Sequence, residues 1–561
     1  MIGLISATAA GAAARDRLAA AWPDRTRVYE GRPLADAVRA ACAECEQLVC
    51  FLATGAVVRL VAPLLGDKAS DPGVVCVDEG GRFAVSLVGG HAGGANELAR
   101  AVGEVLGARP VVTTATDAVH LPGLDTLGLP VEGDVAAVSR ALLDGEAVAL
   151  RAEVSWPLPP LPVADEGAYT LRVTDRLVEP GAREVVLRPP TLVVGVGASK
   201  GAPVEEVLGV IEGALREAGL SAASVAGLAT VDAKAGEPGI VAAARRLGVP
   251  VVTYAAGELA RVEVPNPSGA PLAAVGTPSV AEAAALLGGG ELLVPKRKSA
   301  GRPATATCAV VRRPGRGRLA VVGLGPGARD LLTPRAKAEL RRASVLVGLD
   351  QYVDRIRDLL RPGTRVLESG LGAEEERART AVAEARRGQA VALIGSGDAG
   401  VYAMASPALA EASDDIDVVG VPGVTAALAA GAVLGAPLGH DHVSISLSDL
   451  HTPWDVIERR VRAAAEADLV VTFYNPRSRG RDWQLPKALG ILAEHREPVT
   501  PVGVVRNASR ADESSRLTTL AALDPATVDM MTVVTVGNTA TREIAGRMVT
   551  PRGYRWQEGA R

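Results

Sequence analysis

The chain has 561 residues, a length that favours about three or four domains. Hydrophobic residues make up 48% and charged residues 22%, which excludes a mainly disordered chain, because enough apolar surface is present to offset the entropy of ordering. The net charge of −4 and the aromatic share of 3% exclude the basic field and the base-stacking platforms of a general nucleic-acid-binding protein, so we expect no nucleic-acid partner.

The first 122 residues alternate short apolar runs with helical patterns. The runs at 1–8, 47–54, 73–78 and 110–116 predict strands, and the patterns at 15–22, 33–45 and 95–107 predict helices. This alternation is typical of an α/β domain with a mostly parallel sheet and helical crossovers.

The five cysteines form a sparse, odd set, namely Cys42, Cys45, Cys50, Cys76 and Cys308, which does not predict a disulfide framework. Three of them follow a C-x2-C-x4-C spacing, so a metal site is one alternative. No fourth ligand follows at a zinc or iron–sulfur spacing, and the cysteines fall on a helical pattern and the next strand. We predict structural thiols in a reducing cytoplasm and no metal site.

Two loops of this first domain carry polar side chains at strand ends. The segment GGHAGGAN places His91 among four glycines before a helix, which exposes backbone around one titratable group. The segment TTATD ends on Asp117. Either His91 or Asp117 could act as a general base, and a tight turn without chemistry is the alternative.

The proline-rich stretch 156–169 ends this rhythm and predicts either a domain boundary or an irregular middle segment. The α/β rhythm resumes at 191–201 and continues to about Val311. The loops of this second region offer further polar candidates for a cleft, namely Lys200, Asp232, Lys234 and Glu237.

These loops resemble the cobalt-precorrin-5A hydrolase family of corrin biosynthesis. GGHAGGAN and TTATD are similar to its N-terminal domain, and ATVDAKAGEPG, VEVPNPS, VGTPSVAEAAA and LVPKRK to its C-terminal domain. The resemblance implies opening of a ring lactone and loss of a two-carbon unit as acetaldehyde. On this basis His91 and Asp117 are catalytic candidates, and Lys200, Asp232, Lys234 and Glu237 are substrate-binding candidates.

A short charged segment, RRPGRGR, precedes a new α/β unit that opens at Leu319. We therefore expect a hydrolase-like N-terminal domain at 1–122, a middle segment at 123–189, a hydrolase-like C-terminal domain at 190–311 and a linker at 312–317. The last unit, 318–561, should consist of two subdomains at about 318–435 and 436–561.

The longest uncharged run, Val418 to Gly439, is long enough to span a membrane but contains two prolines and five glycines. It predicts a strand, a Pro-Gly turn and a short helix instead. The N-terminus lacks the basic region of a signal peptide. We expect a cytoplasmic protein without a membrane partner.

Small and polar residues recur at the predicted strand ends of the last unit. The turn GLGPG contains Gly323, Gly325, Pro326 and Gly327, and its proline interrupts the dinucleotide-binding pattern. GSGDAGVY, PGVTA, YNPRSRGR and VGNTATR follow in the same kind of position. Open α/β sheets bind ligands at such strand ends.

In order along the chain, GLGPG, GSGDAGVY, PGVTA, SLSDLHTPW, YNPRSRGR, RNASR, VGNTATR and MVTPRGY resemble the tetrapyrrole methyltransferase family, and within it the precorrin-3B C(17)-methyltransferases. The resemblance implies two α/β subdomains with S-adenosylmethionine in the cleft between them. The cofactor-binding candidates that it implies are Gly323, Gly325, Pro326, Gly327, Ser396, Gly397, Asp398, Val401, Thr425, Ala426, Tyr474, Gly537, Asn538 and Thr539.

The substrates of that family carry many carboxylates, which guanidinium groups bind in a bidentate fork. Arg477, Arg479, Arg481 and Arg506 are therefore the substrate-binding candidates, with solvated loop charges as the alternative. The family also contracts the macrocycle, a step that needs a proton moved. For that step Asp449 is our first choice and His442 the second, although both could instead cap a helix or bond across the subdomain joint.

Together the two resemblances predict a bifunctional corrin-biosynthesis enzyme with S-adenosylmethionine as cofactor and precorrins as substrates. One alternative makes the N-terminal half a non-catalytic corrinoid-binding module. Another changes the methyl acceptor to a protein or a different tetrapyrrole, and the arginines of YNPRSRGR favour a polycarboxylate over a protein. We expect a homodimer through the methyltransferase half.

Overall fold

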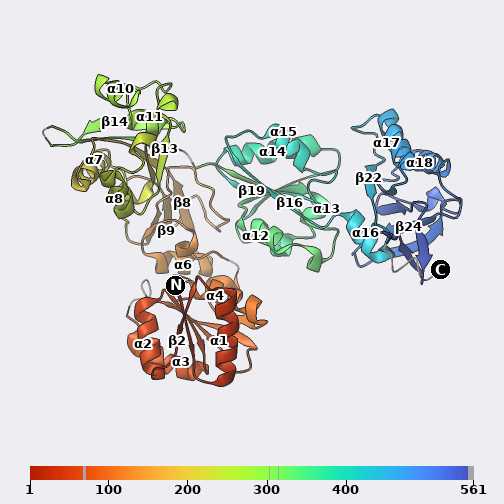
Figure 1. Ribbon diagram of the computed structural model, residues 1–561, viewed down its shortest axis with the longest axis horizontal. Coiled ribbons are helices and arrows are strands. Elements are labelled where there is room, and N and C mark those ends of the chain that lie inside the picture. The colour runs from red at the N-terminus through yellow and green to blue at the C-terminus, as the bar shows by residue number, and fades with distance from the viewer. Residues whose placement is uncertain (67–70, 92, 120, 302, 314, 554–561) are drawn as a thin grey trace. The chain divides into compact units, whose positions relative to one another are not determined.

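A computed structural model describes residues 1–66, 71–91, 93–119, 121–301, 303–313 and 315–553. The chain forms two compact units, one of residues 1–315 with 361–363 and one of residues 316–360 with 364 onward. Each unit consists of helices packed on sheets, which confirms the predicted α/β class (Figure 1). In the described part of the chain, no helix is both long and apolar enough to cross a membrane.

The first sheet has the strand order β2-β1-β3-β4-β5-β6. Its strands are β1 (Ile2–Ser6), β2 (Thr26–Tyr29), β3 (Gln47–Phe51), β4 (Gly73–Val77), β5 (Phe83–Val88) and β6 (Arg109–Val111). Helices α1 (Ala9–Ala21) and α4 (Ala95–Leu106) cover one face, and α2 (Leu34–Glu44) and α3 (Thr54–Val61) cover the other (Figure 1).

The strands of this sheet do not all run the same way. β1 to β4 are parallel, β5 is antiparallel to β4, and β6 is parallel to β5. β6 is also shorter than the strand predicted at 110–116, because the chain turns into the short helix α5 (Ala115–Ala118). The carboxyl ends of β5 and β6 therefore share an edge, opposite to the carboxyl ends of β1, β3 and β4.

The middle segment forms a second sheet with the order β7-β10-β9-β8. Its elements are β7 (Val131–Gly133), α6 (Val135–Asp144), β8 (Val148–Ala152), β9 (Tyr169–Val173) and β10 (Glu184–Leu187). The proline-rich stretch before β9 contains little regular structure, as the sequence predicts. Its apolar side chains, among them Trp156 and Leu161, nevertheless pack onto the core of this sheet.

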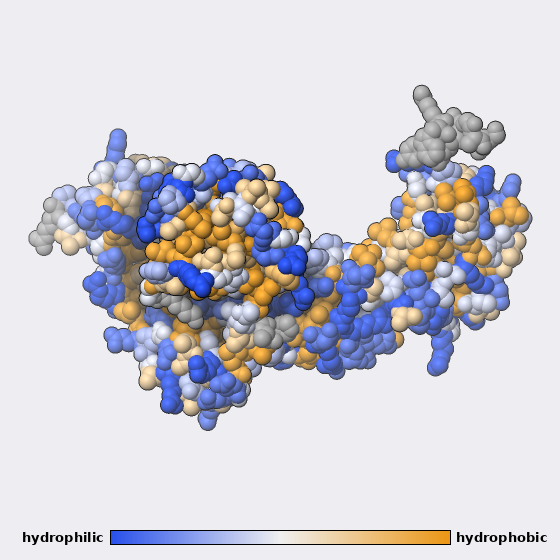
Figure 2. Space-filling model, turned by 90° about the horizontal axis from the view of Figure 1, so that it is seen from below, coloured by the Kyte–Doolittle hydropathy of each residue, from blue (hydrophilic) through white to orange (hydrophobic). Residues whose placement is uncertain are grey.

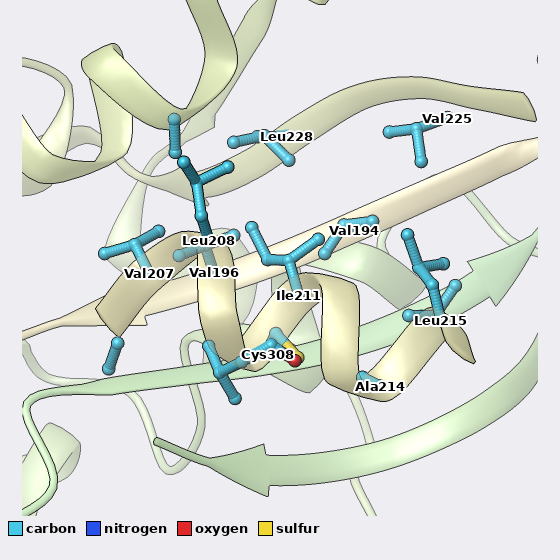
Figure 3. Close-up of a cluster of buried hydrophobic side chains, with 14 of the residues drawn as sticks. Val194, Val196, Val207, Leu208, Ile211, Ala214, Leu215, Val225, Leu228 and Cys308 are labelled. Atoms are coloured by element: carbon cyan, nitrogen blue, oxygen red, sulfur yellow. The ribbon is translucent and has the colours of Figure 1, made fainter. Parts of the chain in front are cut away.

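The third sheet has the order β13-β12-β11-β15-β14. Its elements are β11 (Leu192–Ala198), α7 (Val204–Glu217), β12 (Val225–Val231), α8 (Pro238–Leu247), β13 (Val251–Tyr254), α9 (Ala256–Leu259), α10 (Gly269–Val275), α11 (Ala281–Leu286), β14 (Glu291–Lys298) and β15 (Ala306–Arg312). Helix α7 buries Val207, Leu208 and Ile211 against this sheet, because their spacing of one and three residues places them on one helix face (Figure 3). Cys308 lies in the same core, and burial raises the pKa of its thiol to about 12.

The second unit opens with a fully parallel sheet of order β18-β17-β19-β16-β20. Its elements are β16 (Arg318–Gly323), α12 (Pro334–Arg342), β17 (Val345–Leu349), α13 (Asp350–Val353), β18 (Arg365–Ser369), α14 (Glu374–Arg386), β19 (Ala390–Gly395), α15 (Ala405–Glu411) and β20 (Asp417–Val421). Helices α14 and α15 cover one face, and α12 and α13 cover the other (Figure 1). The strand, turn and helix predicted in the uncharged run are present as β20 and α16 (Ala426–Leu434).

The last large sheet has the order β22-β23-β26-β24-β25. Its elements are β22 (His442–Ser446), α17 (Trp454–Glu466), β23 (Val470–Tyr474), α18 (Gln484–Ala493), β24 (Pro501–Arg506), β25 (Ser514–Thr519) and β26 (Thr532–Val536), and β21 (Gly435–Ala436), β27 (Arg542–Ile544) and β28 (Arg547–Val549) form a small sheet beside it. Helices α17 and α18 pack on one face of the large sheet and α16 on the other.

The strands of this last sheet run in both directions. Only β22 and β23 pair in parallel, and β26 is antiparallel to both β23 and β24. β24 consequently runs in the same direction as β23, whereas β26 runs the opposite way. The direction of each strand decides which loops meet at one edge.

The molecular surface drawn in Figure 2 shows hydrophobic residues gathered in patches that hydrophilic residues border. Exposed apolar side chains of the second unit include Leu371, Leu428 and Leu450.

Candidate functional site

Three loops of the second unit meet at the carboxyl edge of its parallel sheet. They follow β16, β19 and β20, which are neighbours in that sheet. Gly325 and Gly397 exchange two backbone hydrogen bonds, with N–O distances of 3.0 and 2.8 Å. Both residues have positive φ values of 75° and 68°, which favour glycine. The GLGPG and GSGD loops are therefore joined directly through their backbones.

The third loop, PGVTA, packs against the other two at Gly423. A Cβ atom at Gly423 would lie 2.1 Å from the carbonyl oxygen of Gly397, so no larger residue fits there. The carboxylate of Asp398 accepts hydrogen bonds from the amides of Gly400 at 2.8 Å and Gly423 at 2.9 Å. Asp398 thus holds its own loop and PGVTA together, and Ser396 lies half-buried beside it.

Tyr474, at the end of β23, connects these loops to the second subdomain. Its hydroxyl lies 2.5 Å from Thr425 Oγ1 and accepts a hydrogen bond from the amide of Ala427 at 2.8 Å. The Tyr474 ring lies 5.2 Å from that of Tyr402. The structure thereby brings together the predicted candidates from GLGPG, GSGD and PGVTA and Tyr474.

Tyr402 is a residue of this site that the sequence candidates missed. Its hydroxyl donates to the carbonyl of Ser444 at 2.6 Å, and burial raises the pKa of this phenol. Its φ of 52° is unusual for a residue with a large side chain, and such backbone is typical of functional sites. The sequence could have pointed to Tyr402, because this residue ends the motif GSGDAGVY and follows the candidate Val401.

A cavity of about 1020 Å³ opens beside Tyr402. Its lining includes Met404, Ser446, His451 and Asn475. Asn475 has a φ of 50° and donates to Ser446 Oγ at 3.0 Å, which fixes the chain where β22 and β23 end. His451 belongs to the SLSDLHTPW motif, which also contains Asp449.

The two catalytic candidates of this unit lie at opposite ends of β22. Asp449 follows the carboxyl end of the strand, is exposed, and accepts a hydrogen bond from Gln484 Nε2 at 2.9 Å. Burial lowers the pKa of the nearby Arg481, and the charge of Asp449 opposes that shift. His442 begins the strand and is exposed, with its Nδ1 3.1 Å from the carbonyl of His440. The structure does not bring His442 to the edge that carries Asp449.

Most of the predicted substrate-binding arginines already have partners in the protein. Arg506 pairs with Asp529 at 2.8 Å and with Asp512 at 3.4 Å. Arg477 donates to a backbone carbonyl at 2.6 Å, and Arg481 donates to two, at 2.6 and 3.0 Å. Arg479 is exposed. Because Arg477, Arg481 and Arg506 already donate to groups within the protein, they have fewer N–H donors left for a ligand.

The predicted cofactor contact at Gly537, Asn538 and Thr539 lies at the opposite edge of the sheet. Val536, which precedes them, pairs with Val471 at the start of β23, because β26 is antiparallel to β23. The segment that follows β24, and not the one after β26, lies at the same edge of the sheet as Tyr474. There Asn507 donates to the carbonyl of Met531 at 2.9 Å, and the buried Ala508 packs with Val424 and Ala426.

Two tryptophans lie where the Asp449 loop and the Arg481 loop enter their helices. Trp454 begins α17, and Trp483 immediately precedes α18. Their rings meet edge to face with centroids 4.8 Å apart. The pair connects the starts of the two helices.

In the first unit, His91 and the TTATD segment come together at one sheet edge. His91 Nε2 lies 2.6 Å from Thr116 Oγ1. The fully buried Asn96 accepts from Ser86 Oγ at 2.7 Å and donates to Thr114 Oγ1 at 3.0 Å. The side chain of Asp117 lies outside the described residues. The glycine loop is thereby fixed to the segment that follows β6.

A second polar group forms at the ends of the parallel strands β11 and β12. Glu237 accepts from the amide of Gly201 at 2.6 Å and pairs with Lys234 at 3.2 Å. Burial alone would raise the pKa of Glu237, but the Gly201 amide and Lys234 hold it below its usual value. Lys200 and Asp232 are exposed nearby in sequence, so their role stays a prediction.

In the hydrolase-like C-terminal domain, three of the motifs that carry the resemblance meet around the buried carboxylate of Glu282. Glu282, in VGTPSVAEAAA, accepts hydrogen bonds from both the backbone and the side chain of Asn266, at 3.1 and 2.8 Å. It also accepts from the amide of Lys296, in LVPKRK, at 2.9 Å. These motif residues therefore stabilise the fold.

Comparison with known families agrees with this organisation. Residues 318–524 match the family described as Tetrapyrrole (Corrin/Porphyrin) Methylases. Residues 36–117 match Cobalamin synthesis G N-terminal, and residues 192–311 match Cobalamin synthesis G C-terminus. These matches confirm both resemblances that the sequence motifs indicate.

Individual relatives match the last unit. A probable cobalt-factor III C(17)-methyltransferase of Salmonella typhimurium is 46% identical over 239 residues, which are 42% of this chain and 99% of that protein. A precorrin-3B C(17)-methyltransferase of Sinorhizobium is 41% identical over 250 residues, which are 42% of this chain and 97% of that protein. The crystal structure of the methyltransferase CobJ is 39% identical and covers 42% of this chain and 100% of its own, with a TM-score of 0.40.

Proposed function

Since this chain belongs to the tetrapyrrole (corrin/porphyrin) methylase family, we propose that its last unit methylates C-17 of precorrin-3B or cobalt-factor III and contracts the ring. The observation that carries this proposal is the convergence of three glycine loops on Tyr474. The two relatives, which this chain covers almost completely, act on these substrates by name.

The residues at the three loops fit S-adenosylmethionine. Glycines at 325, 397 and 423 leave backbone uncovered, and a Cβ atom at any of them would be strained or would clash. When bound, the cofactor supplies an electrophilic methyl group. Methyl transfer to an electron-rich carbon depends mainly on alignment, which a rigid backbone cradle provides.

The proposed roles of the side chains follow from their contacts. Asp398 uses its carboxylate to hold two loops, so it orients the cradle. Tyr474 ties Thr425 to the second subdomain and keeps the two sides of the site in register. Asp449, exposed at the same edge of the second subdomain, is the group we propose to move the proton during ring contraction.

For the N-terminal half we propose a hydrolase that opens the lactone of precorrin-5A, or of its cobalt form, and releases acetaldehyde. The pairing of His91 with Thr116 supports this role, because a hydroxyl partner orients the ring for proton transfer from water. His91 and Asp232 belong to different sheets, so their convergence in one cleft stays a prediction. A non-catalytic corrinoid-binding module is the second candidate.

Three further features stay proposals. The division at residues 122, 189, 311 and 317 describes the domains we expect. We also propose that the protein forms a homodimer through its methyltransferase half and that it is cytoplasmic.

The cofactor assignment is tested by calorimetry with S-adenosylmethionine on the full-length chain. Asp398→Ala should abolish measurable binding, because the amides of Gly400 and Gly423 lose their common acceptor and the loops separate. Asp414→Ala, at an exposed carboxylate away from the loops, is the matched control and should bind normally. Unchanged affinity in Asp398→Ala would remove the glycine loops from the cofactor site.

A further inference from the structure

Arg510 lies across the glycine turn GLGPG. Its Nε donates to the carbonyl of Pro326 at 3.1 Å, and its Nη1 donates to Asn507 Oδ1 at 3.2 Å. A Cβ atom at Gly327 would come within 2.6 Å of Arg510 Cγ. The third glycine of the turn therefore makes room for the aliphatic part of this arginine, and its charged end is held at the turn.

A second arginine faces the same turn from the segment after α13. Arg355 lines a small pocket of about 30 Å³ together with Tyr352, Gly325, Gly327 and Ser396. That volume holds one or two waters, or the head of a carboxylate. Burial lowers the pKa of Arg510, and the positive charge of Arg355 lowers it further, so the two guanidinium groups are within electrostatic reach of each other.

Neither arginine at this turn forms an ion pair in the described structure, although the charge of Asp512 partly opposes the lowering of the pKa of Arg510. Arg329, which lines the same pocket, pairs with Asp358 at 2.5 Å, and Arg506 pairs with two aspartates. Among the described residues, Arg355 makes no ion pair and Arg510 bonds only neutral acceptors. Two like charges held together cost free energy unless an anion joins them.

We propose that Arg355 and Arg510 form a clamp that binds one carboxylate side chain of the substrate at the GLGPG turn. The inference rests on the proposed function, which makes the substrate a polycarboxylate. Arg477, Arg481 and Arg506, which the sequence suggested for carboxylate binding, already bond groups within the protein. We therefore assign carboxylate binding to Arg355 and Arg510, which were not among the sequence candidates. The planar fork of each guanidinium suits a carboxylate.

The test measures binding of uroporphyrin, a stable tetrapyrrole with carboxylate side chains, by fluorescence titration at several salt concentrations. Arg355→Gln is the main variant, because the described structure gives this side chain no bond whose loss would disturb folding. Arg510→Gln is the second variant. Arg459→Gln, which removes an exposed charge from α17, is the matched control.

We expect Arg355→Gln and Arg510→Gln each to raise the Kd for uroporphyrin about tenfold, as the loss of a charge-assisted bond does. Both should also flatten its salt dependence, a readout that a merely structural role would not move. Arg459→Gln and wild type should behave alike, and the octamethyl ester of uroporphyrin should not distinguish wild type from Arg355→Gln.

Two failures are distinguishable. If wild type binds uroporphyrin and Arg355→Gln binds it equally well, the clamp is wrong and the proposed function stands. If wild type binds S-adenosylmethionine in calorimetry but not uroporphyrin, the polycarboxylate substrate class fails, and the clamp fails with it.

Discussion

At the scale of single residues, buried carboxylates in this protein hold loops in place. Glu237 is 7% exposed and bonds the amide of Gly201, and Glu282 gathers three motifs by the same means. The sequence identified Glu237 as a polar candidate but could not identify its partner. Gly201 lies 36 residues away, and only the pairing of β11 with β12 brings the two loops together.

The lowered pKa of Glu237 predicts a pH-dependent contribution to stability. A carboxyl group whose folded pKa lies below its unfolded value stabilises the protein above about pH 4.3, and this contribution is lost as the pH falls through the folded pKa. Glu237→Gln should therefore lower the free energy of unfolding by about 1–2 kcal/mol at pH 7, with the difference from wild type shrinking as the pH falls below about 4.3.

Urea unfolding from pH 7 to pH 3 measures this difference. Glu212→Gln, at an exposed position of α7, is the control and should match wild type at every pH. A deficit in Glu237→Gln that does not shrink at all over this pH range would show that the charge of Glu237 is not what stabilises the loop.

At the scale of elements, strand direction decides which motifs share a site. The sequence predicted the strands, helices and loops around GLGPG, GSGD and PGVTA because local patterns define them. It grouped Gly537, Asn538 and Thr539 with these loops because their motif also follows a strand, and nothing local shows that β26 runs against β23, which puts them at the other edge of the sheet. Partners such as Asp529 for Arg506 were hidden for the same reason, since the pairing of β24 with β26 creates them.

This topology predicts opposite outcomes for two substitutions. Thr539→Ala should change the affinity for S-adenosylmethionine less than twofold, because Thr539 lies at the far edge of the sheet and bonds Asp468 there. Ala508→Leu should weaken it more than about tenfold, because a larger side chain would displace Val424 and Ala426 from their packing.

Calorimetry with both purified variants decides between the two edges, and thermal unfolding checks that each one folds. Tight binding by Ala508→Leu combined with loss of binding in Thr539→Ala would place the cofactor at the edge that the sequence motif first suggested.

At the scale of the whole molecule, each unit has its own hydrophobic cores and its own group of polar loops. The two sets of motifs agree on one biosynthetic pathway, which the sequence alone could show. Which groups act in the first unit could not be predicted, because His91 lies at a strand end of the first sheet, whereas Lys200 and Asp232 lie at strand ends of the third.

The division into units predicts that the two activities can be separated by mutation. His91→Gln removes proton transfer while keeping some hydrogen bonding to Thr116, so it should slow acetaldehyde release by about 10²–10⁴-fold. Methyl transfer should remain at the wild-type rate, because His91 lies in the other unit.

Acetaldehyde is measured with precorrin-5A or its cobalt form as substrate, and methyl transfer by mass spectrometry of the tetrapyrrole product. Wild-type acetaldehyde release by His91→Gln would exclude His91 from the mechanism. A wild-type protein that releases none would establish the corrinoid-binding module instead.

The edge-to-face contact of Trp454 and Trp483 gives this enzyme a built-in optical reporter. The chain has only five tryptophans, and this pair sits where the loops of Asp449 and Arg481 enter α17 and α18. Indoles this close couple electronically, so their near-ultraviolet circular dichroism and emission depend on the angle between the rings. Movement of either loop when a ligand arrives would change that signal, and turnover could be followed without any attached dye.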